Sequence, residues 1–221
     1  MSRLEDELNP AADSLLQREQ EHPDAQRALR VLFTTIPATG HFQPLVPFAR
    51  GLAAGHTVAF ATTPDFVAAI EASGFDCFAV GVPKTPKDAL QERGIGPARL
   101  SPEEGNLLAM QWFFLGDHKR REIHELLALI AAWQPDLLVR EETEFAGCVA
   151  AERAGLPHAA IQIIARGLPP SVRAVAPPRL NALCGAVGLP PDPDLASWAR
   201  YLCLSPFPPS LHPADAVVAP T

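Results

Sequence analysis

Long apolar runs and an excess of basic residues are both missing from this chain of 221 residues. No apolar run approaches the roughly 18–20 residues that cross a bilayer, and no signal-peptide pattern is present. Acidic residues outnumber basic ones by 25 to 18, and no cluster of Lys or Arg alternates with aromatic residues as a nucleic-acid surface requires. We therefore expect a cytoplasmic protein with no membrane span and no nucleic-acid partner.

Sequence signatures of disulfides and metal sites are also missing. The four cysteines are widely spaced, form no C-x-x-C pair and lie in apolar contexts, which predicts free buried thiols at Cys77, Cys148, Cys184 and Cys203. His118 and His124 would lie on different faces of a helix, and neither has a Cys or a carboxylate at ligand spacing. We predict that the chain binds no metal ion.

Glycine-rich phosphate-binding motifs are absent as well. A dinucleotide requires G-x-G-x-x-G after the first strand, where this sequence offers only Gly40. The second predicted strand ends in Ala61-Thr62-Thr63, without the acid that would hold a ribose, and no G-K-[ST] follows a glycine loop. These absences argue against an independent dinucleotide-binding domain and against a P-loop.

What the sequence does contain is a regular alternation of strands and helices. Short apolar or β-branched runs predict strands at 31–36, 57–61, 75–80, 137–139 and 158–164, and residues 201–204 are strand-like. Helical patterns lie between and after them, at 42–52, 63–74, 101–115, 117–133, 143–154, 171–188 and 192–200. The alternation predicts an α/β fold, a doubly wound, Rossmann-like parallel sheet with the loops after the strands along one edge.

The length favours a single domain, which we expect to span residues 29–205. Residues 1–28 are polar and predict a mobile extension with at most a marginal helix at 14–21, whereas 206–221 resemble a truncated proline-rich linker. Half of the 24 prolines follow Pro157, and Pro177 and Pro178 should break the helix at 171–188.

His41 follows the first predicted strand, after the small-residue loop Ala38-Thr39-Gly40. Ligands bind at the carboxyl ends of strands in open parallel sheets, and imidazole groups titrate near neutral pH. His41 is therefore a candidate general base. The alternative is that it only caps or packs the turn.

Charged residues follow the fourth predicted strand, at Arg140, Glu141 and Glu142. If this strand lies next to the first, Glu141 and His41 share one crevice. A carboxylate bonded to one imidazole nitrogen would orient the ring and stabilise its protonated form, leaving the other nitrogen to accept a proton. The alternative is that these acids only complement the dipole of the following helix.

The helix at 101–115 opens with a capping box, and its last residues are almost continuously apolar. This segment either lines a pocket or belongs to an ordinary core. Before it, residues 81–100 are rich in proline and glycine and predict a long loop, and such loops are usually functional or mobile.

Several segments resemble one family, the N-terminal half of the inverting GT-B glycosyltransferases that use nucleotide sugars, especially bacterial enzymes that glycosylate macrolides and aromatic polyketides. VLFTTIPATGHFQPLVPFARGL is similar to their first strand, loop and helix, with the G-H-x-x-P signature at Gly40, His41 and Pro44. Similar segments follow in order along residues 30–213: GHTVAFATTPDF, PDLLVREETEFAGCVAAERAG, GLPHAAIQ and SPFPPSLHP.

The resemblance implies that this half holds a hydrophobic small-molecule acceptor and that a second half holds the nucleotide sugar, a co-substrate that requires no metal or other cofactor. His41 would deprotonate the acceptor hydroxyl, which attacks the anomeric carbon with inversion. A carboxylate after the fourth strand supports this histidine in many members, and Glu141 fits that role better than Arg140. Acceptor contacts are expected from Phe42, Met110, Trp112, Phe113 and Thr143.

Two functions remain open on these grounds. The chain is either the acceptor-binding half of a glycosyltransferase, inactive without a missing or separate donor-binding domain, or a non-catalytic binding or helper protein that partners a full transferase. Sugar transfer after a donor domain is supplied would favour the first, whereas binding without turnover would favour the second.

Overall fold

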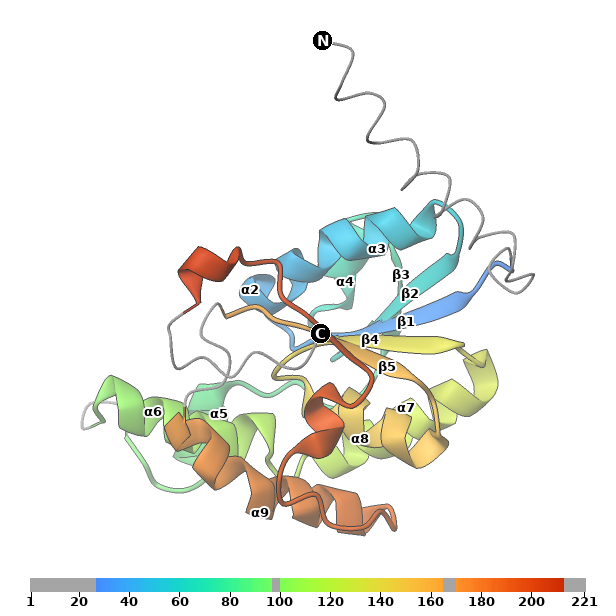
Figure 1. Cartoon of the computed structure of the whole chain (residues 1–221). Helices are drawn as coiled ribbons and strands as arrows, with labels where there is room; N and C mark the ends of the chain where they lie inside the picture. Colours follow the sequence, from blue (N-terminus) through green and yellow to red (C-terminus); the bar gives the residue numbers. More distant parts are fainter. Residues whose placement is uncertain (1–26, 97–99, 165–169, 213–221) are drawn as a thin grey trace.

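A parallel sheet of six strands forms the centre of the molecule (Figure 1). The computed structural model describes residues 27–96, 100–164 and 170–212, so most of the expected extension 1–28, including its marginal helix, and the end of the expected linker 206–221 lie outside it. The sheet order is β3-β2-β1-β4-β5-β6. The strands are β1 Arg30–Thr34, β2 Thr57–Thr62, β3 Asp76–Ala79, β4 Leu137–Glu141, β5 His158–Ile161 and β6 Leu202–Leu204.

This order confirms the predicted doubly wound sheet, because the chain starts at the centre and changes direction between β1 and β4. Helices α2 to α4 cover one face and α5 to α9 the other (Figure 1). The α-helices are α2 Thr39–Phe42, α3 Val46–Ala53, α4 Val67–Glu71, α5 Pro86–Gln91, α6 Pro102–Ala109, α7 Lys119–Trp133, α8 Phe145–Ala154 and α9 Pro170–Ala186. A π-helix spans Met110–Phe114, and 3-10 helices span Gln43–Leu45, Ala196–Ala199 and Pro209–Leu211.

The central strand β1 is buried on both faces, as its apolar run predicts. Val31 and Phe33 belong to the core cluster shared with α3 and α4, whereas Leu32 belongs to the cluster shared with α7, α8 and α9. Successive side chains of a strand point to opposite faces, so one short run serves both cores. The rings of Phe33 and Phe60 stack with centroids 5.0 Å apart, which fixes β1 against β2.

The predicted helix at 42–52 is divided into three pieces. A single helical turn, α2, begins at Thr39, the 3-10 helix Gln43–Leu45 follows, and α3 begins at Val46. Pro44 and Pro47 explain the interruptions, since neither can donate a backbone hydrogen bond. His41 consequently lies within a helical turn and not in a loop.

The predicted break at Pro177 and Pro178 is wrong, because α9 runs through both prolines. On either side of them, Ala176, Leu180 and Leu183 are buried in one core cluster. The packing of α9 against α6, α7, α8 and the π-helix offsets the two backbone hydrogen bonds that the prolines remove.

Several other boundaries differ from those predicted. Strand β4 continues to Glu141 because Arg140 and Glu141 pair with Ala160 and Ile161 of β5, and β5 ends there. Helix α4 starts at Val67 because Thr63 does not cap it; the Thr63 hydroxyl bonds to the Asp65 carboxylate instead. The remaining predicted helices begin or end within a few residues of those observed, except at 192–200, where only a 3-10 helix forms.

All four cysteines are free thiols. Cys148 and Cys184 are buried as predicted, whereas Cys77 and Cys203 are only half-buried. Burial raises the pKa of the Cys184 thiol to about 11 and that of Cys77 to about 12, so both thiols are protonated at neutral pH.

Candidate active site

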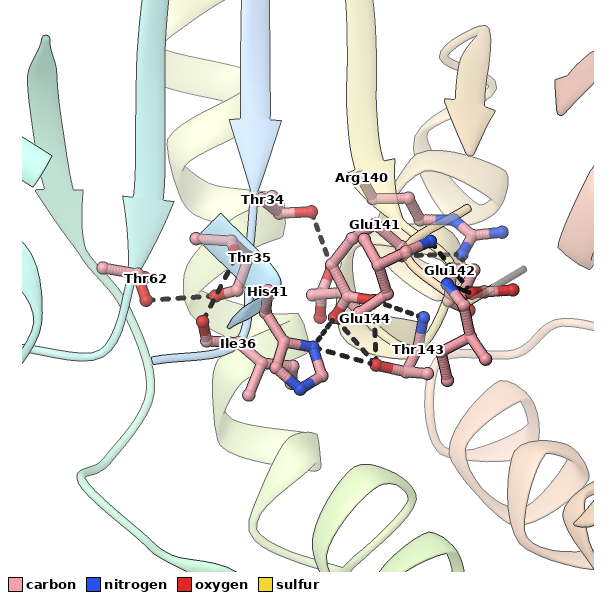
Figure 2. A network of polar contacts seen from close by, with 12 residues as sticks. Thr34, Thr35, Ile36, His41, Thr62, Arg140, Glu141, Glu142, Thr143 and Glu144 are labelled. Atoms are coloured by element: carbon pink, nitrogen blue, oxygen red, sulfur yellow. Dashed lines mark hydrogen bonds and ion pairs between the residues drawn. The ribbon is translucent and has the colours of Figure 1, made fainter. Parts of the chain in front are cut away.

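His41 and Glu141 meet where β1 and β4 lie side by side, at the carboxyl ends of the strands (Figure 2). His41 Nδ1 lies 3.0 Å from Glu141 Oε1. The Glu141 side chain is fully buried, whereas 21% of the His41 side chain is exposed. The structure therefore brings together the two residues that the sequence places after neighbouring strands.

Thr143 reinforces this pair from the loop between β4 and α8. Its backbone N–H donates to Glu141 Oε2 at 2.6 Å, and its hydroxyl lies 2.9 and 2.8 Å from the two carboxylate oxygens. The same hydroxyl is 3.3 Å from His41 Nδ1. Thr143 is 3% exposed. These contacts make it a partner of Glu141, so we do not assign it the expected acceptor contact.

The hydrogen bonds fix how the imidazole can react. An ionised carboxylate only accepts hydrogen bonds, so its contact with Nδ1 favours the tautomer in which Nδ1 carries the proton. Nε2 then presents a lone pair, and it has no hydrogen-bond partner within the part of the chain that the structure describes. A ring held in this way can accept a proton from a hydroxyl near Nε2.

Arg140, the alternative to Glu141, lies on the far side of Glu141 from His41 (Figure 2). Its buried guanidinium donates to the backbone carbonyls of Glu141 and Glu142, each at 3.3 Å, and to that of Trp198. Alternating strand residues point in opposite directions, which explains why only one of the two neighbours reaches His41. Glu141 is therefore the residue in contact with the imidazole.

Two more buried carboxylates flank the pair. Glu142 Oε1 accepts from the N–H groups of Ile163 and Ile164 at 3.0 and 2.8 Å. Glu144 caps α8 by accepting from the N–H groups of Ala146 and Gly147, at 2.9 and 2.8 Å. Burial is the main cause that raises the pKa of each carboxyl to about 7. Both therefore hold a proton for part of the time at neutral pH.

A buried ammonium group lies behind these acids. Lys119 Nζ is 2.7 Å from Glu122 Oε2, and the two side chains are 3% and 6% exposed. Burial opposes the charge of Lys119, but the carboxylates of Glu122, Glu144 and Glu141 outweigh it and raise the pKa of the ammonium. Lys119 therefore stays charged and balances part of the negative charge at this edge of the sheet.

Phe114 is the aromatic residue beside the imidazole, and sequence analysis did not select it. Its ring centroid is 5.8 Å from that of His41, with the planes tilted by 36°. A π-helix places this ring: the N–H of Leu115 bonds to the carbonyl of Met110, five residues back, so α-helical spacing does not give the neighbours of Phe114. The only sequence signal was its place in the apolar end of the predicted helix.

Most of the other expected acceptor contacts lie in the protein interior. Phe42 is 2% exposed and packs edge-on against Phe60 and Phe66 in the core, so we do not assign it to the acceptor site. Met110 and Phe113 are each 4% exposed. Trp112 is half-buried, but its ring is covered by the guanidinium groups of Arg93 and Arg179. The wall near His41 is thus formed by Phe114, with Phe113 behind it.

The described residues carry neither a cluster of metal ligands nor a membrane-spanning helix. Within residues 27–96, 100–164 and 170–212, no group of three or more His, Cys, Asp or Glu residues is arranged to hold a metal ion. No helix among these residues is long and apolar enough to span a bilayer.

Known proteins resemble this chain in both sequence and fold. The chain is 34% identical to the L-demethylnoviosyl transferase of Streptomyces niveus over 193 residues, covering 86% of this chain and 47% of that protein. It is 31% identical to the aclacinomycin-T 2-deoxy-L-fucose transferase of Streptomyces galilaeus, covering 59% of this chain and 36% of that protein. The chain thus spans less than half the length of these two relatives.

Solved glycosyltransferase structures superpose on the same region. SsfS6 of Streptomyces sp. SF2575 matches with a TM-score of 0.68 at 23% identity, covering 84% of this chain and 52% of that one. The spinosyn forosaminyltransferase SpnP matches with a TM-score of 0.62 at 26% identity, covering 86% and 49%. These matches confirm the expected N-terminal half of a GT-B fold. Residues 51–219 also match the family model described as erythromycin biosynthesis protein CIII-like, N-terminal domain. The chain belongs to this family of N-terminal glycosyltransferase domains.

Proposed function

We propose that this chain is the acceptor-binding half of a glycosyltransferase that moves a sugar from a nucleotide sugar to a hydroxyl group of a hydrophobic natural product. The observation that carries the proposal is the His41–Glu141 pair, held at 3.0 Å at the carboxyl ends of β1 and β4, with no hydrogen bond from Nε2 to the residues that the structure describes. Its place at the point where the strand order reverses, where such sheets bind ligands, supports the proposal.

In the proposed reaction His41 acts as the general base. The acceptor hydroxyl lies near Nε2 and transfers its proton to this nitrogen while its oxygen attacks the anomeric carbon of the sugar. The bond from that carbon to the nucleoside diphosphate breaks, the diphosphate leaves with the electron pair, and the anomeric configuration inverts. Glu141 stabilises the imidazolium that forms and holds the ring in place.

The acceptor is proposed to lie against Phe114, because this ring is next to His41 and an aromatic face suits an apolar ligand. Relatives of this chain are named for the transfer of sugars to aklavinone, tylactone and erythronolide, an aromatic polyketide and two macrolides. We propose acceptors of this chemical class for the present chain.

The donor is proposed to be a thymidine diphosphate sugar bound by residues outside this chain. Thymidine diphosphate is the nucleotide bound in one structure each of SsfS6, VinC and SpnG. The residues described here offer no glycine-rich phosphate loop after β1, so we place donor binding on a second domain, in the same polypeptide or in a separate one.

The test is to join this chain, or mix it, with the donor-binding half of a relative such as the L-demethylnoviosyl transferase. Sugar transfer from thymidine diphosphate sugars to a panel of polyketide aglycones is then measured. We expect transfer, and a loss of about 10³-fold in kcat/KM for His41→Ala, within the range of general base catalysis. The matched control is His124→Ala, which removes an exposed histidine on α7 and should change kcat/KM less than about twofold.

Activity that survives His41→Ala would contradict the role of this residue. Aglycone binding without transfer, with every donor half supplied, would contradict the enzymatic proposal and favour the non-catalytic helper.

A further inference from the structure

The indole ring of Trp112 lies between two guanidinium groups. Arg93 Cζ is 3.4 Å from the centroid of the ring and Arg179 Cζ is 3.5 Å from it. Two guanidinium groups at these distances over one face would overlap, so they cover opposite faces. Arg93 follows α5, Trp112 belongs to the π-helix and Arg179 lies in α9. One side chain therefore joins three segments that are distant in sequence.

Each guanidinium of this Arg93–Trp112–Arg179 stack is attracted to the indole ring. Each cation lies over the negative face of the indole, well within the distance at which cation–π contacts are favourable. The two cations repel one another across the whole thickness of the stack, which is about twice either contact distance. The Asp117 carboxylate, 3.9 Å from the Arg93 guanidinium, offsets part of that repulsion.

The stack acts on an uncommon backbone conformation. A π-helix is less favourable than an α-helix and persists where surrounding contacts hold it. On one side of Met110–Phe114 the holding contact is the stack; on the other it is Phe113, which is buried against Ile36. Gly116 completes the arrangement, because a Cβ at this position would overlap the carbonyl group of Trp112.

Phe114 projects from the end of this π-helix toward the imidazole. Its ring centroid is 4.9 Å from that of Phe113 and 5.8 Å from that of His41. Phe114 is only partly buried, so few side-chain contacts hold its ring. The position of the ring therefore depends on the backbone conformation of the π-helix. A change in the register of the π-helix would move it away from His41.

We propose that Arg93 and Arg179 are positioning residues of the acceptor site, which clamp Trp112 and thereby hold Phe114 beside His41. The inference rests on the proposed function only in taking the side of His41 next to Phe114 as the place of the acceptor. With both faces of Trp112 covered, an aromatic acceptor stacks on Phe114 and not on Trp112.

The first test needs neither acceptor nor donor. In the full chain, NMR cross-relaxation between the ring protons of His41 and Phe114 is compared between the wild type and Arg179→Met, which keeps a long side chain and removes its charge. We expect the cross-peak to weaken and the His41 ring protons to lose the ring-current shift caused by Phe114. Arg179→Lys keeps a cation over the indole and should restore both signals in part.

The matched control is Arg173→Met on the same helix, because Arg173 contacts no aromatic ring within the described part of the chain. It should leave both NMR signals unchanged. An unchanged His41–Phe114 cross-peak in folded Arg93→Met/Arg179→Met, where both cations are removed, would overturn the inference.

The second test uses the complete transferase assembled as above. Arg179→Met should raise the KM for the acceptor several-fold and leave kcat nearly unchanged, since it weakens binding without touching the base. A loss confined to kcat would overturn the inference. The NMR result is independent of turnover, so failure of the clamp and failure of the proposed function are distinguishable.

Discussion

Two histidine–glutamate pairs lie at opposite ends of the strands of the sheet. Their contacts have the same length, but their surroundings differ. His41 Nδ1 is 3.0 Å from Glu141 Oε1 at the carboxyl ends of the strands, and His158 Nε2 is 3.0 Å from Glu152 Oε1 at the amino end of β5. His158 is only 1% exposed, and Arg200 donates to the same oxygen of Glu152 at 2.7 Å.

The difference shows that a histidine–carboxylate contact does not by itself indicate catalysis. The His158–Glu152 contact connects β5 to α8. The ring of Tyr201 packs edge-on against that of His158, with ring centroids 5.2 Å apart. Burial is the main cause that lowers the pKa of His158, which favours its neutral form. The His41 pair keeps one nitrogen open at the edge where parallel sheets bind ligands. Position and access distinguish the two pairs.

The largest expected contrast is in catalysis. In the complete transferase, Glu141→Gln should lower kcat/KM about 100-fold, because an amide does not stabilise the imidazolium as a carboxylate does. Glu152→Gln should change kcat/KM less than about twofold and act on stability instead. Rates with saturating donor and varied acceptor measure both. Equal losses in the two variants would remove the distinction between the pairs.

A buried carboxyl group near His41, that of Glu142, should make the free energy of unfolding fall as pH rises. Burial raises the pKa of Glu142 to about 7 from its ordinary value of 4.5, so the folded state binds the proton more tightly than the unfolded state. This contribution is fully present below pH 4.5 and is lost as pH rises through about 7.

Urea unfolding at several pH values measures this dependence. Glu142→Gln cannot titrate, so the difference in unfolding free energy between the two ends of that pH window should shrink by on the order of 2 kcal/mol relative to the wild type. A wild-type pH dependence retained in the variant would contradict the assignment to Glu142.

His158, at the other end of the strands, should make the free energy of unfolding change with pH in the opposite direction. The pKa of His158 is lowered from its ordinary value of 6.5, mainly by burial, so the folded state binds this proton less tightly than the unfolded state. Its contribution is present above pH 6.5 and is lost as pH falls through the folded-state value. His158→Gln should reduce the loss of unfolding free energy below pH 6.5 and leave the pH dependence caused by Glu142 unchanged. If the loss at acid pH is the same in the variant as in the wild type, His158 does not cause it.

The smallest expected contrast concerns the side chains that donate a further hydrogen bond to the two glutamates, Thr143 to Glu141 and Arg200 to Glu152. Thr143→Val removes the hydroxyl that contacts Glu141 but keeps the backbone N–H bond, and should lower kcat/KM about fivefold, equivalent to one net hydrogen bond. Thr143→Ser keeps the hydroxyl and serves as the control. Arg200→Met removes the corresponding donor to Glu152 and should leave the rate unchanged. A rate loss in Arg200→Met would contradict the contrast.

The sequence was sufficient to predict the sheet and the meeting of His41 with Glu141. Both predictions depend on strand ends, and parallel strands bring their carboxyl ends to one edge whatever the exact boundaries. The choice of Glu141 over Arg140 agrees with the contact, because neighbouring residues of a strand point in opposite directions.

The acceptor wall could not be predicted in the same way. The family resemblance led us to expect contacts from Met110 and Phe113, which lie in the core, and passed over Phe114. The π-helix changes which side chains share a face, and the sequence gives no sign of it. The stack on Trp112 joins segments far apart in the chain, and no local pattern reports such contacts. The continuous helix through Pro177 and Pro178 likewise depends on tertiary packing, which overrides local propensity.

The cap that Glu144 places on α8 has a consequence for hydrogen exchange. Its carboxylate also accepts from the hydroxyl of Thr34 at 2.6 Å, so β1 and the first turn of α8 share one buried acceptor. A Cβ at Gly147 would overlap both Glu144 and Thr34, which leaves this junction no room to loosen. The amides of Ala146 and Gly147, at a helix end that would ordinarily fray, should therefore exchange with deuterium as slowly as the central strands and open only with them.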